Sequence, residues 1–313
     1  METELLRVTQ LTKAYGGRRA VDGVSFTVSR GQTVGLLGPN GAGKSTTVGM
    51  ICGLIAADSG SVTLEGRAVT TGANGAKRRI GFVPQDLALY EDLSALENLK
   101  LFAALYGLKG AHCRRRADEV LALVNLSERA HDKPATFSGG MRRRLNIAAA
   151  LMHDPELLIL DEPTVGVDPQ SRNAIFDTLD RLKADGCALI YTSHYMEEVE
   201  RLADRIVIVD HGKVLVDDTP EGLFRKLPAH AALRVDFDSP VGDALLDGAR
   251  GCAGVTGVAR EGDGIEIKLA AAGDALPVMS WLSSQGARPT YFATARASLE
   301  DIFLNLTGRT LRD

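Results

Sequence analysis

The sequence predicts an α/β core followed by a smaller α+β domain. Residues 157–160 and 188–192 are continuous apolar runs, the pattern of strands covered on both faces in a parallel sheet, and helical stretches separate them. A third apolar run, residues 33–37, ends at a glycine-rich loop, and residues 45–54 after the loop have helical character. The order strand, loop, helix indicates an α/β unit.

A small β-rich layer is expected before and beside this core. Residues 5–8 and 24–28 are short apolar runs, and Tyr15-Gly-Gly-Arg18 between them carries a turn signal. Later in the chain, residues 206–209 and 214–216 indicate a hairpin with its turn at His211-Gly212.

A helical subdomain is expected at about residues 88–150. Residues 95–106 have helical apolar spacing, and Ser94 with Glu97 forms a capping box at the start of that helix. A second helix is expected at residues 113–124.

The C-terminal part of the chain predicts a separate small domain. Thr219-Pro220 has the chemistry of a helix start, and we place the boundary near Leu227-Pro228, which gives domains 1–227 and 228–313. A last helix is expected at residues 299–307. The elements before it have the order strand, helix, strand, strand, helix, strand, which matches a ferredoxin-like domain; they lie at residues 233–237, 242–249, 255–260, 265–269, 275–285 and 288–293.

Composition argues against nucleic-acid binding and against a membrane span. The 36 basic and 40 acidic residues give a formal net charge of −4, so no global positive field is available to hold nucleic acid. No stretch approaches the ~20 apolar residues of a membrane-spanning helix, and the start Met-Glu-Thr-Glu lacks a signal-peptide pattern. We therefore expect a cytoplasmic chain. The four cysteines lie far apart without metal-ligand spacing, which favours structural packing.

The glycine-rich loop matches the Walker A pattern of phosphate-binding loops. Its glycines let backbone N–H groups face phosphate oxygens, and the following helix adds the partial positive charge of its N-terminus. Lys44 can reach the β- and γ-phosphates, and the Ser45 hydroxyl can ligate Mg²⁺. ATP and Mg²⁺ are therefore the predicted ligands. The predicted binding residues of the loop are Gly38, Pro39, Asn40, Gly41, Ala42, Gly43, Lys44, Ser45 and Thr46.

Two carboxylates follow the apolar run at residues 157–160, as a Walker B element requires. Asp161 is predicted to belong to the nucleotide-binding site, where it would hold Mg²⁺ through water. Glu162 is one residue farther, on the other face of the strand end, and is predicted to polarise the water that attacks the γ-phosphate.

Phe137-Ser138-Gly139-Gly140-Met141 resembles the signature motif of ATP-binding cassette (ABC) ATPases and lies shortly before Walker B, as in that family. The resemblance implies a P-loop ABC ATPase domain with a RecA-like core, an antiparallel β subdomain and a helical subdomain. Further motifs occur in family order: Tyr15 as the adenine-stacking aromatic, Gln85 in the Q-loop, Asp168 in the D-loop and His194 as the switch histidine. In this resemblance Gln85 senses Mg²⁺ and relays the nucleotide state, and His194 contacts the γ-phosphate.

The signature motif predicts a second anion site. Ser138 and the N–H groups of Gly139 and Gly140 begin a helix over residues 141–152. In the family two cassettes pack head to tail, and this site closes over the γ-phosphate on the partner's Walker A loop. We therefore expect hydrolysis to require a second copy of the chain or a homologous ATPase subunit.

Two motifs depart from the family pattern. Met141 stands where the signature usually has Gln and cannot hydrogen-bond a ribose in the same way, which predicts weaker or altered closure of the dimer. Val165 and Val167 replace the commoner Ser and Leu of the D-loop, which puts communication between the two sites in doubt.

Two basic runs, residues 114–116 and 142–144, suggest a nucleic-acid or headgroup contact. Solvated helix faces explain them better, because the chain is net acidic and no aromatic residues are interleaved. Residues 142–144 could instead support the dimer interface.

The end of the chain, residues 297–309, is similar to the tail of daunorubicin-resistance-type exporter subunits, and residues 139–145 also point to type-2 exporters. The resemblance implies an ATPase peripheral on the inner face of the cell membrane, exporting a drug, antibiotic or lipid-like substrate through a separate permease. That permease is expected to dock near residues 85–107, in a groove lined by Tyr90 and Leu93.

Two other functions stay open at this stage. One is a soluble ABC ATPase acting on ribosomes or nucleic acid, although such proteins usually fuse two cassettes or carry coiled-coil arms. The other is a regulatory module that cycles nucleotide slowly, which Glu162 and His194 argue against.

Overall fold

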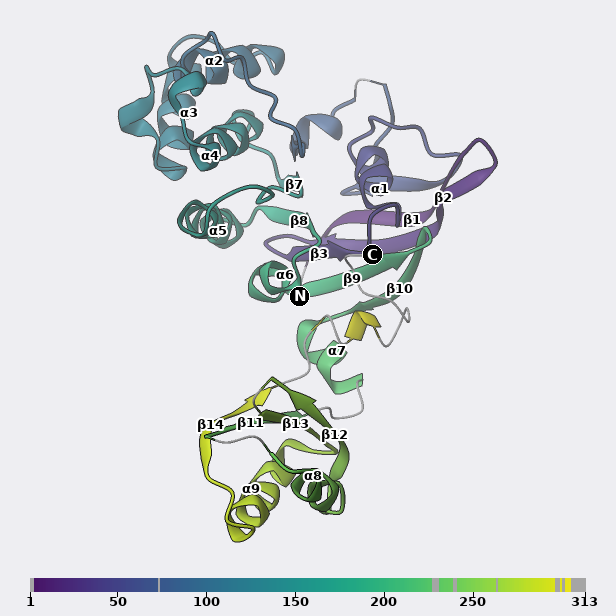
Figure 1. Cartoon of the computed structure of the whole chain (residues 1–313). Helices are drawn as coiled ribbons and strands as arrows, with labels where there is room; N and C mark the ends of the chain where they lie inside the picture. Colours follow the sequence, from purple (N-terminus) through teal and green to yellow (C-terminus); the bar gives the residue numbers. More distant parts are fainter. Residues whose placement is uncertain are drawn as a thin grey trace. The chain divides into compact units, whose positions relative to one another are not determined.

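The computed structural model describes residues 3–72, 74–226, 231–238, 241–262, 264–295, 299 and 302–304 (Figure 1). The chain divides into two compact units, and the division falls between Pro220 and Glu221. The sequence pattern put the boundary a little later, near residue 227. Each unit has a hydrophobic core of its own.

The first unit is built around a six-stranded sheet in the order β10-β9-β3-β8-β7-β6. Neighbouring strands from β9 to β6 run parallel, and β10 pairs antiparallel with β9 at one edge. Every residue of β3, β7 and β8 is buried, as expected for a sheet covered on both faces. The strands are β3 (Thr33–Leu37), β6 (Ile80–Val83), β7 (Leu157–Asp161), β8 (Ala188–Ser193), β9 (Arg205–Asp210) and β10 (Lys213–Asp218).

Helices pack closely on this sheet. Gly35 in the middle of β3 allows α6 (Met196–Leu202) to approach, because a Cβ at Gly35 would lie 2.3 Å from Val199 Cγ1. Helix α1 (Lys44–Ile51) follows β3 and the glycine-rich loop in the sequence, and it contributes Val48 and Ile51 to the core. The strand, loop and helix order predicted for the phosphate-binding loop is therefore present.

A second, antiparallel sheet has the order β2-β1-β4-β5 and shares one core with the six-stranded sheet. Its long strands extend well beyond the predicted apolar runs, because register shifts in the pairing of β1 with β2 interrupt the alternation of apolar residues. The strands are β1 (Glu4–Tyr15), β2 (Arg18–Ser29), β4 (Ser59–Leu64) and β5 (Arg67–Ala68).

The helical subdomain contains α2, α3 and α4, which lie together in Figure 1. The predicted capping box starts α2: Glu97 N donates to Ser94 Oγ over 3.3 Å, and Ser94 N donates to the Glu97 carboxylate over 2.7 Å. These helices are α2 (Ala95–Leu105), α3 (Gly110–Leu123) and α4 (Gly139–Ala150), with short 3₁₀ turns at η2 (Ser127–Arg129) and η3 (Pro134–Thr136) between α3 and α4. Outside this subdomain, η1 (Lys77–Arg79) precedes β6, and α5 (Pro169–Ala184) joins β7 to β8.

The second unit is an antiparallel four-stranded sheet in the order β12-β13-β11-β14 with two helices. This is the strand order of a ferredoxin-like domain, as predicted. Leu233 and Val235 of the sheet pack with Val278 and Leu282 of α9. The elements are α7 (Pro220–Lys226), β11 (Ala231–Phe237), α8 (Asp243–Arg250), β12 (Val255–Glu261), β13 (Gly264–Leu269), η4 (Ala272–Asp274), α9 (Ala275–Ser284) and β14 (Pro289–Ala295).

The predicted last helix falls mostly outside the described residues, which include only Leu299 and residues 302–304 of it, all in helical conformation. Among the described helices, none combines the length and the apolarity that crossing a membrane requires. All four cysteines are free thiols, and burial raises the pKa of Cys52 and of Cys187 to about 12. These two thiols are therefore unreactive packing residues at neutral pH.

Candidate nucleotide-binding site

The glycine-rich loop joins β3 to α1, and its backbone lies tightly against two strands. Gly43 has φ 104°, and a Cβ there would lie 2.3 Å from the carbonyl oxygen of Ala20 on β2. At Gly38 a Cβ would lie 2.1 Å from the carbonyl oxygen of Val209 on β9. Gly41 has φ 77° with open space around it, so there glycine is needed for the backbone angle alone.

Lys44 begins α1 and is only 6 % exposed. Its ammonium group donates to the carbonyl oxygens of Gly38 at 2.6 Å and Pro39 at 3.1 Å. Burial lowers the pKa of Lys44, and the nearby Glu162 and Asp161 carboxylates partly oppose that change. The lysine is thus a buried cation next to both Walker B acids.

A pocket of about 380 Å³ lies beside the loop. Tyr15, half exposed at the end of β1, forms part of its wall, as expected for an aromatic that stacks on a base. Arg18 and Ala20 also line it, and no motif pointed to them. The lining residues that the sequence predicted are Tyr15, Asn40, Gly41, Gly43, Lys44, Ser45, Thr46, Gln85 and Glu162.

One threonine hydroxyl contacts both Walker B residues, at the carboxylate of Asp161 and at the backbone N–H of Glu162. Thr192 Oγ1, on β8, donates to Asp161 Oδ1 over 2.6 Å and accepts from Glu162 N over 2.9 Å. Asp161 ends β7 and is 7 % exposed, whereas Glu162 lies just past the strand with φ 48°. The two acids therefore leave the sheet in different directions.

Two predicted side chains converge on Glu162. His194 Nδ1 lies 3.4 Å from Glu162 Oε2, and Gln85 Nε2 donates to the same oxygen over 3.4 Å. His194 follows β8, Gln85 follows β6 and Glu162 follows β7, so adjacent parallel strands bring the three side chains to one edge of the sheet.

The signature residues and Asp168 do not line this pocket. Ser138 caps α4 by accepting from Met141 N over 3.2 Å, and Asp168 caps α5 by accepting from Ser171 N over 2.9 Å. The two helix starts are close together, because a Cβ on Gly140 would lie 2.1 Å from Ser171 Oγ. Hydrogen bonds at its helix cap hold the pKa of the Asp168 carboxyl below its usual value.

The donors near the pocket fit Mg²⁺ carried by a nucleotide. The described residues contain no group of three or more His, Cys, Asp or Glu side chains able to hold a metal by themselves. What they offer is the Ser45 hydroxyl, the Gln85 amide and the buried Asp161 carboxylate, all oxygen donors of the kind that Mg²⁺ prefers when phosphates supply the other ligands.

Comparisons with known proteins agree with this geometry. Residues 21–165 match the family described as ABC transporter. Over 312 residues the chain is 47 % identical to the linearmycin resistance ATP-binding protein LnrL of Bacillus subtilis, covering 99 % of this chain and 100 % of that protein. The chain belongs to the ATP-binding subunits of ABC transporters. This ABC subunit is also 39 % identical to the Nod factor export ATP-binding protein I of Ralstonia nicotianae, over 99 % of the chain and 96 % of the relative.

Solved structures support the fold of the ABC subunit. One described as the ATP-binding subunit of an ABC transporter superposes with a TM-score of 0.65 at 35 % identity, covering 71 % of this chain and 92 % of that one. Another, the ADP conformation of the ATP-binding cassette MJ1267, gives a TM-score of 0.64 at 28 % identity, over 70 % and 92 % of the two chains. The predicted fold class and ATPase activity are thereby confirmed.

The second basic run of the ABC subunit is not a solvated face, contrary to expectation. Arg143 is buried and donates to the carbonyl oxygens of Pro84 at 3.0 Å and Gln85 at 2.8 Å. Arg144 donates to the carbonyl of Val124 at 2.7 Å. Sequence reasoning missed Arg143 because its acceptors are backbone atoms about 60 positions away in the chain, which no residue pattern reveals.

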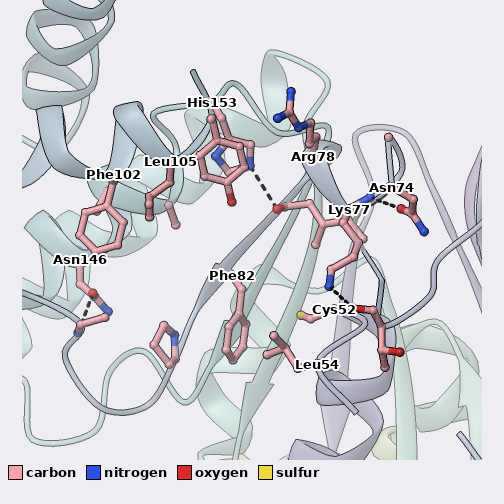
Figure 2. A pocket seen from close by; sticks show the side chains of 18 residues that line it. Cys52, Leu54, Asn74, Lys77, Arg78, Phe82, Phe102, Leu105, Asn146 and His153 are labelled. Atoms are coloured by element: carbon pink, nitrogen blue, oxygen red, sulfur yellow. Dashed lines mark hydrogen bonds between the residues drawn. The ribbon is translucent and has the colours of Figure 1, made fainter. Parts of the chain in front are cut away.

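A second cavity, of about 960 Å³, lies between the core sheet and the helical subdomain (Figure 2). Figure 2 shows Phe102, Leu105 and His153 on one side and Leu54 on the other. The Tyr106 and His153 rings stack at 3.7 Å. The expected Tyr90 and Leu93 do not line the cavity.

The charged groups of this cavity are cations. Lys77 and Arg78 line it, and no Asp or Glu is among the described residues of its wall. Asn146 is 3 % exposed, and its Oδ1 accepts from Ala88 N over 3.2 Å, whereas its Nδ2 has no hydrogen-bond partner among the described residues. The cavity thus combines an apolar wall with two cations and a buried amide donor.

Proposed function

We propose that two ABC subunits close head to tail around two molecules of Mg-ATP, hydrolyse them, and drive export of a drug, antibiotic or lipid-like molecule through a separate membrane permease. The observation that carries the proposal is the convergence of His194 and Gln85 on Glu162 beside the phosphate-binding loop. On this proposal the subunit works peripherally on the inner face of the cell membrane.

In the proposed reaction Glu162 acts as the base. Its carboxylate accepts a proton from water as the water oxygen attacks the γ-phosphorus, and ADP leaves with the bridging oxygen. Lys44 neutralises charge on the β- and γ-phosphates, and His194 orients Glu162 and the γ-phosphate. Tyr15 stacks on the adenine.

Ser45, Gln85 and Asp161 are the residues proposed to hold Mg²⁺, directly or through water. When bound, the ion neutralises charge on the β- and γ-phosphate oxygens. The chain's own contribution is to keep Asp161 fixed through Thr192 and Gln85 fixed through the Arg143 contact to its carbonyl.

The second subunit is proposed because the signature helix lies outside the pocket. Ser138, Gly139 and Gly140 form an amino-terminal helix end that suits a phosphate, and none of them lines the pocket beside the phosphate-binding loop of the same chain. A solved relative in a dimeric post-hydrolysis state with ADP and Pi, MJ0796, supports such a pairing, with a TM-score of 0.63 at 28 % identity over 69 % of this chain and 98 % of that one.

Glu162→Gln tests the catalytic assignment. The amide keeps the side-chain shape but cannot accept the proton, so kcat should fall at least ~100-fold while ATP affinity stays unchanged. Because unhydrolysed ATP keeps both subunits engaged, the variant should sediment as a dimer with Mg-ATP and as a monomer without it.

Glu197→Gln is the matched control, since Glu197 is an exposed carboxylate on α6. It should hydrolyse ATP at the wild-type rate. Equal rates for wild type and Glu162→Gln would refute the assignment of Glu162 as the base.

The cavity of Figure 2 is proposed to receive a permease segment. Its apolar wall, two cations and buried Asn146 donor fit a short helix with apolar side chains and an acidic group or free carbonyl at its end. The relatives' names give linearmycin resistance and Nod factor export as their roles, which supports a lipid-like or antibiotic cargo for this subunit.

Leu105→Glu tests the docking site. Leu105 lines the cavity and is 70 % exposed, so the subunit itself should tolerate the change. A charge buried against an apolar partner costs several kcal/mol, which predicts at least ~10-fold lower recovery of the permease from detergent-solubilised membranes. The ATPase rate of the isolated subunit should not change.

Leu276→Glu is the control, because Leu276 is 77 % exposed in the second unit. It should recover as much permease as wild type. If Leu105→Glu does so as well, the permease docks elsewhere.

A further inference from the structure

Glu198, on α6, is a buried carboxylate that the proposed chemistry does not use. It is only 2 % exposed, and three hydroxyl groups donate to its Oε2 atom. Thr164 Oγ1 lies at 2.7 Å, Tyr191 OH at 2.8 Å and Ser193 Oγ at 2.9 Å. All three donors are themselves about 1 % exposed. Hydrogen bonds to a carboxylate are strong, and they offset the free-energy cost of removing the carboxylate from water.

The donors come from the two segments that carry the reacting side chains. Thr164 is two residues after Glu162, in the loop that leaves β7. Ser193 directly precedes His194, and its Oγ also accepts from Tyr195 N over 2.9 Å. One carboxylate oxygen therefore joins the backbone that follows Glu162 to the backbone on both sides of His194.

The other oxygen of Glu198 faces α5. Arg172 Nε lies 3.3 Å from Glu198 Oε1, and the Arg172 guanidinium lies 5.6 Å from the centre of the Tyr195 ring. That ring lies 4.1 Å from the His194 ring. Since α5 starts at the Asp168 cap, Glu198 also links the start of α5 to the histidine.

The network is separate from the contacts that fix the Walker B acids. The Thr192 hydroxyl contacts the Asp161 carboxylate and the Glu162 N–H, and among the described residues none of its hydrogen bonds goes to Glu198. Thr192 therefore sets where Glu162 leaves the sheet, whereas Glu198 sets the path of the loop after Glu162 relative to His194.

We propose that Glu198 is a positioning residue for hydrolysis: its carboxylate fixes the Thr164 loop and the Ser193–Tyr195 segment at one separation, which keeps His194 within reach of Glu162. This inference rests on the proposed roles of Glu162 and His194. Glu198 itself touches neither substrate nor the reacting atoms.

The test is Glu198→Gln in the full chain. A neutral amide keeps the volume but weakens the three hydroxyl bonds and replaces one acceptor oxygen by a donor group facing Arg172. A small displacement of a reacting group lowers rates steeply, so kcat should fall roughly 10- to 100-fold. KM and the affinity for ATP should stay within about twofold, because none of the hydrogen bonds of the network goes to a described residue of the phosphate-binding loop.

Two further variants keep the test informative if Glu198→Gln folds poorly. Ser193→Ala and Thr164→Val each remove one donor and should each lower kcat by a smaller factor, again at constant KM. Thr178→Val is the matched control: Thr178 is 2 % exposed on α5 and bonds only the carbonyls of Ala174 and Leu123. It should lose stability but keep its kcat.

A signal specific to positioning is the imidazole resonance of His194. It should shift in Glu198→Gln, whereas that of the exposed His131 should not. An unshifted His194 signal, or a kcat loss no larger than in Thr178→Val, would overturn the inference. Glu162→Gln and His194→Ala separate the two proposals: wild-type rates in those variants refute the proposed function, whereas inactive variants beside a fully active Glu198→Gln refute only the role of Glu198.

Discussion

Individual glycines allow the backbone conformation and the close packing of the phosphate-binding loop. We expect Gly43→Ala to cost roughly 2–5 kcal/mol in the free energy of unfolding, because its Cβ would lie 2.3 Å from a carbonyl oxygen and its φ is 104°. ATP affinity should fall with it, since the loop must move away from Ala20. Urea denaturation and equilibrium nucleotide binding measure the two effects.

Gly66→Ala is the comparison for Gly43→Ala. Gly66 has φ 72° but no atom near its Cβ position, so only the backbone term of about 1 kcal/mol applies. Nucleotide binding should be unaffected. Equal losses in the two variants would show that the steric contact with Ala20 does not matter.

For single residues, the sequence predicts a functional role only where the residue belongs to a short local motif. Lys44, Glu162 and His194 could be proposed as site residues because each occupies a fixed place in a short sequence pattern. Arg143 and Glu198 could not, because their meaning depends on partners from distant segments: backbone carbonyls for Arg143, and hydroxyls on a loop and a strand for Glu198.

Arg143 connects helix α4 to the loop after β6 through its hydrogen bonds to the Pro84 and Gln85 carbonyls. In Arg143→Met the carbonyls of Pro84 and Gln85 lose charge-assisted hydrogen bonds, which predicts a loss of about 2–4 kcal/mol in stability. The ATPase rate of the fully folded variant should also fall, because Gln85 is no longer held beside Glu162.

Arg115→Ala provides the control for that prediction, since Arg115 is exposed on α3. Both variants would be compared by denaturation and by ATPase rate at saturating ATP, at a temperature where each is fully folded. An Arg143→Met protein with a normal rate would show that α4 does not fix the position of Gln85.

Element types were easier to predict than element limits. The buried strands β7 and β8 and the capping box of α2 carry strong local signals, and each was found where expected. The strand β1 runs from Glu4 to Tyr15, far past its predicted end, because Gln10 adopts φ 46° within it and register shifts break the apolar alternation there.

At the scale of the whole molecule, each unit has a hydrophobic core of its own among the described residues, so we expect damage to the core of the second unit to leave the first intact. Leu282→Ala removes a fully buried side chain of α9 and should destabilise the second unit by about 2–5 kcal/mol. ATP binding by the first unit should not change. Hydrogen exchange resolved by peptide measures the stability of each unit, and nucleotide titration measures binding.

Leu276→Ala changes the same residue type on the same helix, at a side chain that is 77 % exposed, and should alter neither measurement. If Leu282→Ala lowered ATP affinity, the stabilities of the two units would have to be linked. The sequence could predict the existence and the type of the second unit from its six elements, whereas its division from the first at Pro220 and Glu221 depends on packing.

Glu162 has φ 48°, a backbone angle at which an ordinary side chain costs about 1–2 kcal/mol and glycine costs little. The proposed base therefore occupies a position where stability alone favours glycine. A Glu162→Gly chain would relieve this backbone strain and would lose the group proposed to take the proton. On the proposed role of Glu162, this position is a local trade-off in which activity is favoured over stability.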